Sequence, residues 1–164
     1  MSDVATIDAE FAAWQERVRG KNICETSLLA TDYLNHFNEV VMLIGMVPDM
    51  AEVLEDAKGW KPKSYADHFR DSGFSAKEVA IEAYEHSPRQ FREPFDQTVA
   101  RLNDGVAWSV ARLEQLVAKG DADRIRHFAE ESSRQLQKLI EFASAIINGN
   151  TLNQGEIDQV LRRR

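Results

Sequence analysis

ICETSLLATDYLNHFNEVVMLIGMV, residues 23–47, is the stretch that decides how this chain folds. Asn22 and Glu25 have the spacing of a capping box at a helix N-terminus, and Pro48 cannot continue a helix. At 100° per residue, the apolar side chains of this stretch cover more than half of a helix circumference. We therefore predict one long helix over residues 23–47, about 37 Å long, that lies at the centre of the fold.

Three other segments have the apolar spacing of amphipathic helices, namely residues 4–19, 94–119 and 122–148. A glycine suited to a helix C-terminus follows near the end of each. The last two segments are separated by so short a link that their helices must be antiparallel neighbours. No segment alternates apolar and polar residues as a strand does. The sequence thus predicts an all-α four-helix bundle.

Residues 49–87 contain short helical pieces instead of one long helix. Asp49, Ser64 and Ser75 each stand where a helix N-cap is favoured, and loop residues separate the pieces. A segment divided in this way is too short to enclose a core of its own. We predict a helical crossover within a single domain over residues 1–149.

The composition is that of a soluble globular protein, with 20 basic and 27 acidic residues and a net charge of −7. This charge argues against binding to nucleic acid. The single Cys24 allows no intramolecular disulfide, no signal peptide opens the chain, and no apolar run is long enough to span a membrane. We expect a cytoplasmic protein that neither binds nor crosses a membrane.

No nucleophile elbow, glycine-rich phosphate loop or paired-cysteine motif is present, so no catalytic residue is predicted and an enzyme is disfavoured. The polar residues Asp32, His36 and Glu39 lie one turn apart, opposite the apolar side of the predicted central helix. They are typical of a solvated helix face. If the crossover instead supplies His68 or His86, the same residues would form a site for a transition metal or a small ligand. We predict no cofactor, with that metal site as the alternative.

The loop over residues 59–65 combines two aromatic and two basic residues around a proline. Trp60, Lys61, Lys63 and Tyr65 would suit contact with a flat or anionic ligand. Alternatively, the two aromatic side chains turn inward and hold the crossover on the bundle.

Small or polar residues also interrupt the apolar stripes of the predicted helices. They are Ser27, Asn38, Gly45, Gly105, Ser109 and Ser132. Such residues allow helices to approach closely, and a buried hydroxyl can bond to its own helix. The alternative is that they line a pocket for a small apolar ligand that carries one or two polar groups.

The C-terminal residues 150–164 are predicted to form a separate amphipathic tail. Ile157, Val160 and Leu161 share one side of the short helix that Asn153 would cap.

Within the tail, Gln154, Ile157, Asp158 and Leu161 resemble the peptide S-Q-x-x-I-D-x-L-L of some bacterial flagellar-switch and chemotaxis proteins. Asn153 stands where that peptide has serine, and the resemblance is limited to this segment. In that family the peptide docks on a response regulator, so the resemblance implies a partner-binding tail.

These observations favour a non-catalytic, bacterial-type interaction module with a regulatory or signalling role. We expect it to bind a protein partner, including a second copy of itself in a homodimer, through helix faces and the tail. A bundle enzyme or binding protein with a site at Asp32, His36 and Glu39 is the alternative.

Overall fold

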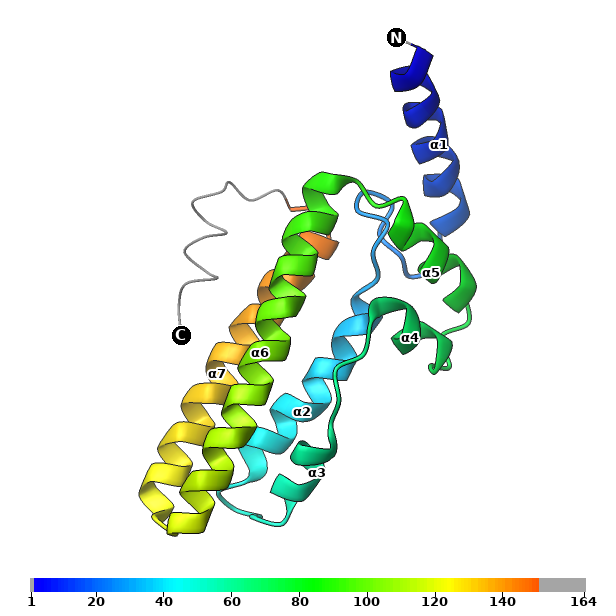
Figure 1. Cartoon of the computed structure of the whole chain (residues 1–164). Helices are drawn as coiled ribbons and strands as arrows, with labels where there is room; N and C mark the ends of the chain where they lie inside the picture. Colours follow the sequence, from blue (N-terminus) through cyan, green and yellow to red (C-terminus); the bar gives the residue numbers. More distant parts are fainter. Residues whose placement is uncertain (1, 151–164) are drawn as a thin grey trace.

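The computed structural model describes residues 2–150, and the side chains from residue 6 onward. Every regular element within these residues is a helix, which confirms the all-α prediction (Figure 1). The elements are α1 (Ser2–Val18), the 3-10 helix η1 (Thr31–Leu34), α2 (Asn35–Met46), α3 (Val53–Gly59), α4 (Tyr65–Arg70), α5 (Lys77–Glu85), α6 (Arg89–Lys119) and α7 (Ala122–Ile147). None of these helices has the length and hydropathy needed to cross a membrane.

The body of the molecule is built on α6 and α7, which lie antiparallel along most of their length (Figure 1). Gly120 joins them with a φ of 74°, and Asp121 accepts a hydrogen bond from the backbone N–H of Arg124 at 3.2 Å. Both features agree with the predicted link between the two helices. Helix α2 packs against α7 and α6, and α3 covers α2 and α6.

The prediction of one helix over residues 23–47 is wrong in its first part, because residues 23–30 form a buried loop. Leu28 has a φ of 63°, a value incompatible with an α-helix. The N–H of Cys24 donates to the carbonyl of Leu29 at 2.9 Å, and the N–H of Leu28 donates to the carbonyl of Cys24 at 2.8 Å. These bonds satisfy the loop backbone in the core, so its apolar residues are buried without a helix.

Ser27 holds this loop against the ends of two helices. Its hydroxyl donates to the carbonyl of Ile147 and accepts from the N–H of Leu29. The hydroxyl of Ser87 donates to the carbonyl of Ser27 at 2.6 Å. Asn22, the predicted helix cap, has a φ of 62° and lies in a turn before the loop. The central helix therefore begins at η1, and α2 continues it to Met46.

The four-helix bundle with the first helix as a member is not confirmed. Helix α1 packs against α5, and its N-terminal part projects from the body (Figure 1). Val18 is fully buried, whereas Ile7 on the same stripe is 61% exposed. Trp14 stacks on His86 with ring centroids 4.6 Å apart. Within the described residues, the last turns of α1 are thus the part that packs on the body.

The crossover consists of α3, α4 and α5, as short helices were predicted there. Ser64 caps α4 by accepting from the N–H of Asp67 at 3.1 Å, which confirms that cap. The first and third pieces begin later than predicted, at Val53 and Lys77, and Ser75 makes no capping bond because Ala76 is the N-cap of α5.

Helix α6 begins at Arg89, five residues before the predicted start at residue 94. Pro94 therefore lies inside the helix and cannot donate the backbone hydrogen bond expected there. The hydroxyl of Thr98 donates to the carbonyl of Pro94 at 2.7 Å, the bond that a threonine in a helix makes to the carbonyl four residues earlier. The helix thus continues through Pro94 and does not begin beside it.

Candidate functional site

Three of the predicted ligand residues meet between the start of α2 and α4. The Nε2 of His68 lies 2.9 Å from the Oδ2 of Asp32, to which it donates a hydrogen bond. The ring centroid of His36 lies 6.4 Å from that of His68. The crossover therefore does cover the polar residues at the start of the central helix.

The ring of His36 packs against the loop that follows α3. Its ring stacks on the indole of Trp60 at 4.5 Å, and the Nε1 of Trp60 donates to the backbone carbonyl of His36 at 2.9 Å. Burial lowers the pKa of His36 and outweighs the carbonyl of Lys61, which acts in the opposite direction. His68 and Lys63 lower this pKa further. The His36 ring is thus favoured in its neutral form.

The other two predicted ligand residues lie elsewhere. Glu39 is exposed further along α2, and His86 stacks on Trp14 of α1. Among the side chains described from residue 6 to residue 150, no three His, Cys, Asp or Glu are grouped so as to hold a metal ion.

The aromatic side chains of the predicted contact loop turn inward. The hydroxyl of Tyr65 accepts a hydrogen bond from the N–H of Ala30 at 2.9 Å. Lys63 pairs with Asp71 at 3.2 Å, whereas Lys61 is exposed. Together with the Trp60 contact, these interactions attach the crossover to the 23–30 loop and to α2.

A small cavity of about 270 Å³ lies beside this aromatic cluster, between the crossover and α6. Burial raises the pKa of Tyr33, one of its lining residues, to about 12. The hydroxyl of Tyr33 donates to the carbonyl of Lys63 at 2.6 Å, and that of Tyr84 donates to Asp96 at 2.6 Å. These phenols are already engaged within the protein.

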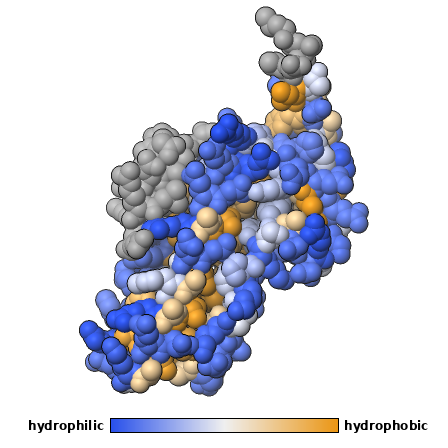
Figure 2. Space-filling view, viewed as in Figure 1, coloured by the Kyte–Doolittle hydropathy of each residue, from blue (hydrophilic) through white to orange (hydrophobic). Residues whose placement is uncertain are grey.

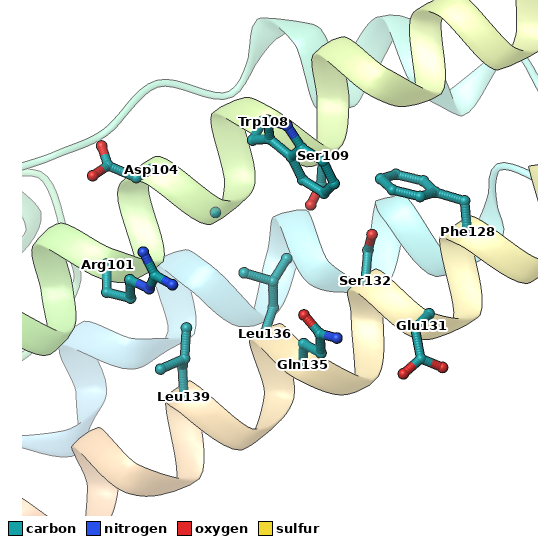
Figure 3. A pocket seen from close by; sticks show the side chains of 11 residues that line it. Arg101, Asp104, Trp108, Ser109, Phe128, Glu131, Ser132, Gln135, Leu136 and Leu139 are labelled. Atoms are coloured by element: carbon teal, nitrogen blue, oxygen red, sulfur yellow. The ribbon is translucent and has the colours of Figure 1, made fainter. Parts of the chain in front are cut away.

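A second cavity, of about 480 Å³, is an open groove between α6 and α7 (Figure 3). We call it the α6–α7 groove. Its lining residues are Arg101, Asp104, Gly105, Trp108, Ser109, Phe128, Glu131, Ser132, Gln135, Leu136 and Leu139. Arg101 and Leu139 lie near one end of the groove, and Phe128 lies at the other (Figure 3).

The floor of the groove exists because small residues face each other across the two helices. A Cβ on Gly105 would lie 2.9 Å from the Cδ2 of Leu136, so the helices approach closely there. Ser109 and Ser132 are buried on facing positions. The two readings of these small residues, close packing and a pocket lining, therefore both apply on this pair of helices.

The remaining small residues serve other purposes. Gly45 of α2 lies close to α7, since a Cβ there would meet the Oγ of Ser133 at 3.2 Å. Ser27 bonds the buried loop, and Asn38 is exposed rather than placed on a core stripe.

Trp108 dominates the upper edge of the groove. It is 63% exposed, and its ring lies 5.4 Å from that of Phe128 across the groove. Such an exposed indole at the edge of an apolar depression is typical of a binding surface. Trp108 lies off the buried stripe of α6, which was the one sequence signal for its exposure.

The polar residues at the edge of the groove carry both signs of charge. Glu131 pairs with Arg134 at 2.6 Å, but Arg101 and Asp104 form no ion pair with any other described residue. A helix that lies in the groove would thus meet apolar residues on the floor and unpaired charges along the edge.

The predicted tail residues Gln154, Ile157, Asp158 and Leu161 lie outside the described residues. No family model, no curated protein and no solved structure matches this chain. The assignment of a function therefore depends on the groove and on the residues around it.

Proposed function

We propose that this chain is a non-catalytic protein-interaction module, and that the α6–α7 groove receives an amphipathic helix from a partner. The observation that carries this proposal is that the exposed Trp108 lies at the edge of a groove of about 480 Å³ with an apolar floor. Helix-in-groove recognition uses an apolar floor of this kind, with polar groups at the edge to set orientation. The cytoplasmic, bacterial-type setting expected from the sequence belongs to the same proposal.

A second copy of the chain supplies a suitable helix, namely the projecting part of α1. Ile7 and Phe11 lie one turn apart on it, and Ile7 is largely exposed (Figure 2 shows an apolar patch there). Residues 2–13 of α1 and the groove from Leu139 to Phe128 each span about 16 Å at 1.5 Å per residue. Docking α1 of one copy beside α6 and α7 of another would complete a four-helix bundle between copies and form a homodimer.

The experiment is light scattering coupled to size-exclusion chromatography, on the full-length protein and on a form that lacks residues 151–164. We expect a concentration-dependent dimer that weakens at least tenfold on Trp108→Ala or Ile7→Ser. Met42→Ala is the matched control, because Met42 is 59% exposed on α2 and outside the groove. A strict monomer that binds no protein partner, with or without the tail, would overturn the proposal.

The second candidate function is a site at Asp32, His36 and His68 for a small ligand, or for a transition metal that needs a further donor group, since these three side chains alone are not grouped to hold one. The observation in its favour is that the Nε2 of His36 is buried without a hydrogen-bond partner among the described residues. Elemental analysis of protein purified without added metal tests it. One equivalent of a transition metal, lost on His36→Ala, would place this function first, whereas metal-free protein counts against it.

A further inference from the structure

The chain leaves α7 through a turn that reverses its direction. The N–H of Gly149 donates to the carbonyl of Ile146, and the N–H of Asn150 donates to that of Ala145, both at 3.0 Å. With a φ of 92° at Gly149, these bonds form a Schellman motif. The segment after Asn150 therefore starts beside the end of α7 and can run back along α6 and α7.

The length of that segment matches the distance to the groove. Leu139 lies eight residues before the end of α7 at Ile147, or about 12 Å along the helix axis. Residues 151–153 span about 10 Å when extended. A helix over residues 154–164 spans about 16 Å, and the groove from Leu139 to Phe128 has about the same length. Residues 151–164 are thus long enough to reach along the groove.

The apolar pattern of the segment matches the groove floor. Ile157, Val160 and Leu161 share one side of such a helix, and this side would lie over Leu136 and the small residues beside it.

The order of charges along the segment also matches the groove edge. Glu156 and Asp158 come first and would lie toward Arg101, which forms no ion pair with another described residue. The last three residues, Arg162–Arg164, would reach Glu131 and the face of Trp108. By contrast, the projecting part of α1 carries Asp8 and Glu10 and no basic residue, so it fits this edge less well.

We propose that residues 153–164 dock as a helix in the α6–α7 groove of their own chain and regulate access to it. This inference depends on the proposed function in one respect, because the tail occupies the groove that a partner helix would need. The tail therefore acts as an internal competitor. Its removal exposes Trp108 and the apolar floor, and its displacement is required before a partner helix binds.

The first experiment measures the binding of a labelled peptide, TLNQGEIDQVLRRR, by fluorescence anisotropy. We expect it to bind the protein that lacks residues 151–164, and to bind the full-length protein at least tenfold more weakly. Trp108→Ala in the truncated protein should weaken binding at least tenfold, whereas Met42→Ala should leave it unchanged. A peptide with Ile157→Asp and Leu161→Asp is the matched control and should not bind. Equal binding to the truncated and full-length proteins, or to Trp108→Ala, would overturn the inference.

The second experiment determines whether the tail binds its own chain. In a Cys24→Ser background, Gln135→Cys and Val160→Cys are combined and oxidised at low protein concentration. We expect a disulfide within one monomer. The matched control pairs Val160→Cys with Gln137→Cys, because residue 137 faces solvent on the other side of α7. A disulfide-linked dimer would show that the tail comes from a second copy and would overturn docking within one chain.

The two experiments also separate this inference from the proposed function. If the peptide does not bind but the truncated protein dimerises through Trp108, the inference fails and the proposed function holds. If the peptide binds but the truncated protein stays monomeric and binds no partner, the inference holds and the proposed function fails.

Discussion

At the scale of single residues, His36 couples the packing of the crossover to pH. Its ring stacks on Trp60, and burial lowers its pKa below the ordinary value of 6.5. The unfolded chain therefore binds a proton at His36 in a pH range where the folded protein does not. His68 and Lys63, which face His36, lower the pKa as well, and only Glu39 and the Lys61 carbonyl act against them.

From this shift we predict that the free energy of unfolding falls as the pH decreases through 6.5 and toward the lower pKa of folded His36. Above 6.5 the ring is neutral in both states and its contribution is fully present. His36→Gln should reduce this slope, as measured by urea denaturation between pH 5 and pH 8. His127→Gln, at an exposed position on α7, is the control and should leave the slope unchanged. An identical slope in wild type and His36→Gln would contradict the prediction.

Tyr65 carries the contact that joins the crossover to the 23–30 loop. Its hydroxyl is the hydrogen-bond acceptor for the backbone N–H of Ala30, and both residues are buried. We predict that Tyr65→Phe lowers the free energy of unfolding by about 1–3 kcal/mol, because it leaves a buried N–H unpaired. Tyr84→Phe should cost less than about 1 kcal/mol, since its bond to Asp96 is exposed to water. Equal losses in urea denaturation would show that the Ala30 bond contributes little.

At the scale of elements, α6 and α7 were readily predicted, and the start of the central helix was not. The long stripes of α6 and α7 repeat over many turns, and a short link with Gly120 and Asp121 joins them. Residues 28–30 are apolar enough for a buried helix, but so short an apolar run fits a buried loop equally well. The bonds that stabilise that loop come from Ser87, Tyr65 and α7, which lie far away in the sequence.

For helix α1, the sequence predicted the helix itself but not the neighbour against which it packs. Its stripe has regular helical spacing, and α1 does form, but spacing does not say which neighbour covers the stripe. In the structure the lower end of the stripe meets α5, and the upper end projects (Figure 1).

This arrangement predicts that substitutions along α1 have unequal effects on stability. Trp14→Ala should lower the free energy of unfolding by about 3 kcal/mol, because Trp14 is buried against α5 and His86. Ile7→Ala should change it by less than about 0.5 kcal/mol, since the side chain is already exposed. Urea denaturation of dilute protein measures both, and a large loss for Ile7→Ala would show that the projecting part contacts the body.

At the scale of the whole molecule, the candidate groove was only partly visible in the sequence. Gly105, Ser109 and Ser132 were identified as small residues on facing helices, and they line the groove. Its polar edge was not identified, because Arg101 and Asp104 look like any solvated residues until the distance between the helices is known. The cluster of Asp32, His36 and His68 required the placement of α4, which no local pattern determines.

The net charge of −7 opposes association of two copies, whereas the basic end of the tail is attracted to Glu131 in its own groove. Salt weakens both effects, since the screening length falls from about 10 Å at 0.1 M to about 3 Å at 1 M. Both changes favour displacement of the tail by α1 of a second copy.

We therefore predict that the dimer fraction of the full-length protein rises with salt, measured by light scattering at fixed concentration. A variant with Arg162, Arg163 and Arg164 replaced by Gln should already dimerise at low salt. The protein without residues 151–164, which lacks the competing tail, should respond less to salt. A dimer fraction that falls with salt, or Gln variants that behave like wild type, would exclude electrostatic control by the tail.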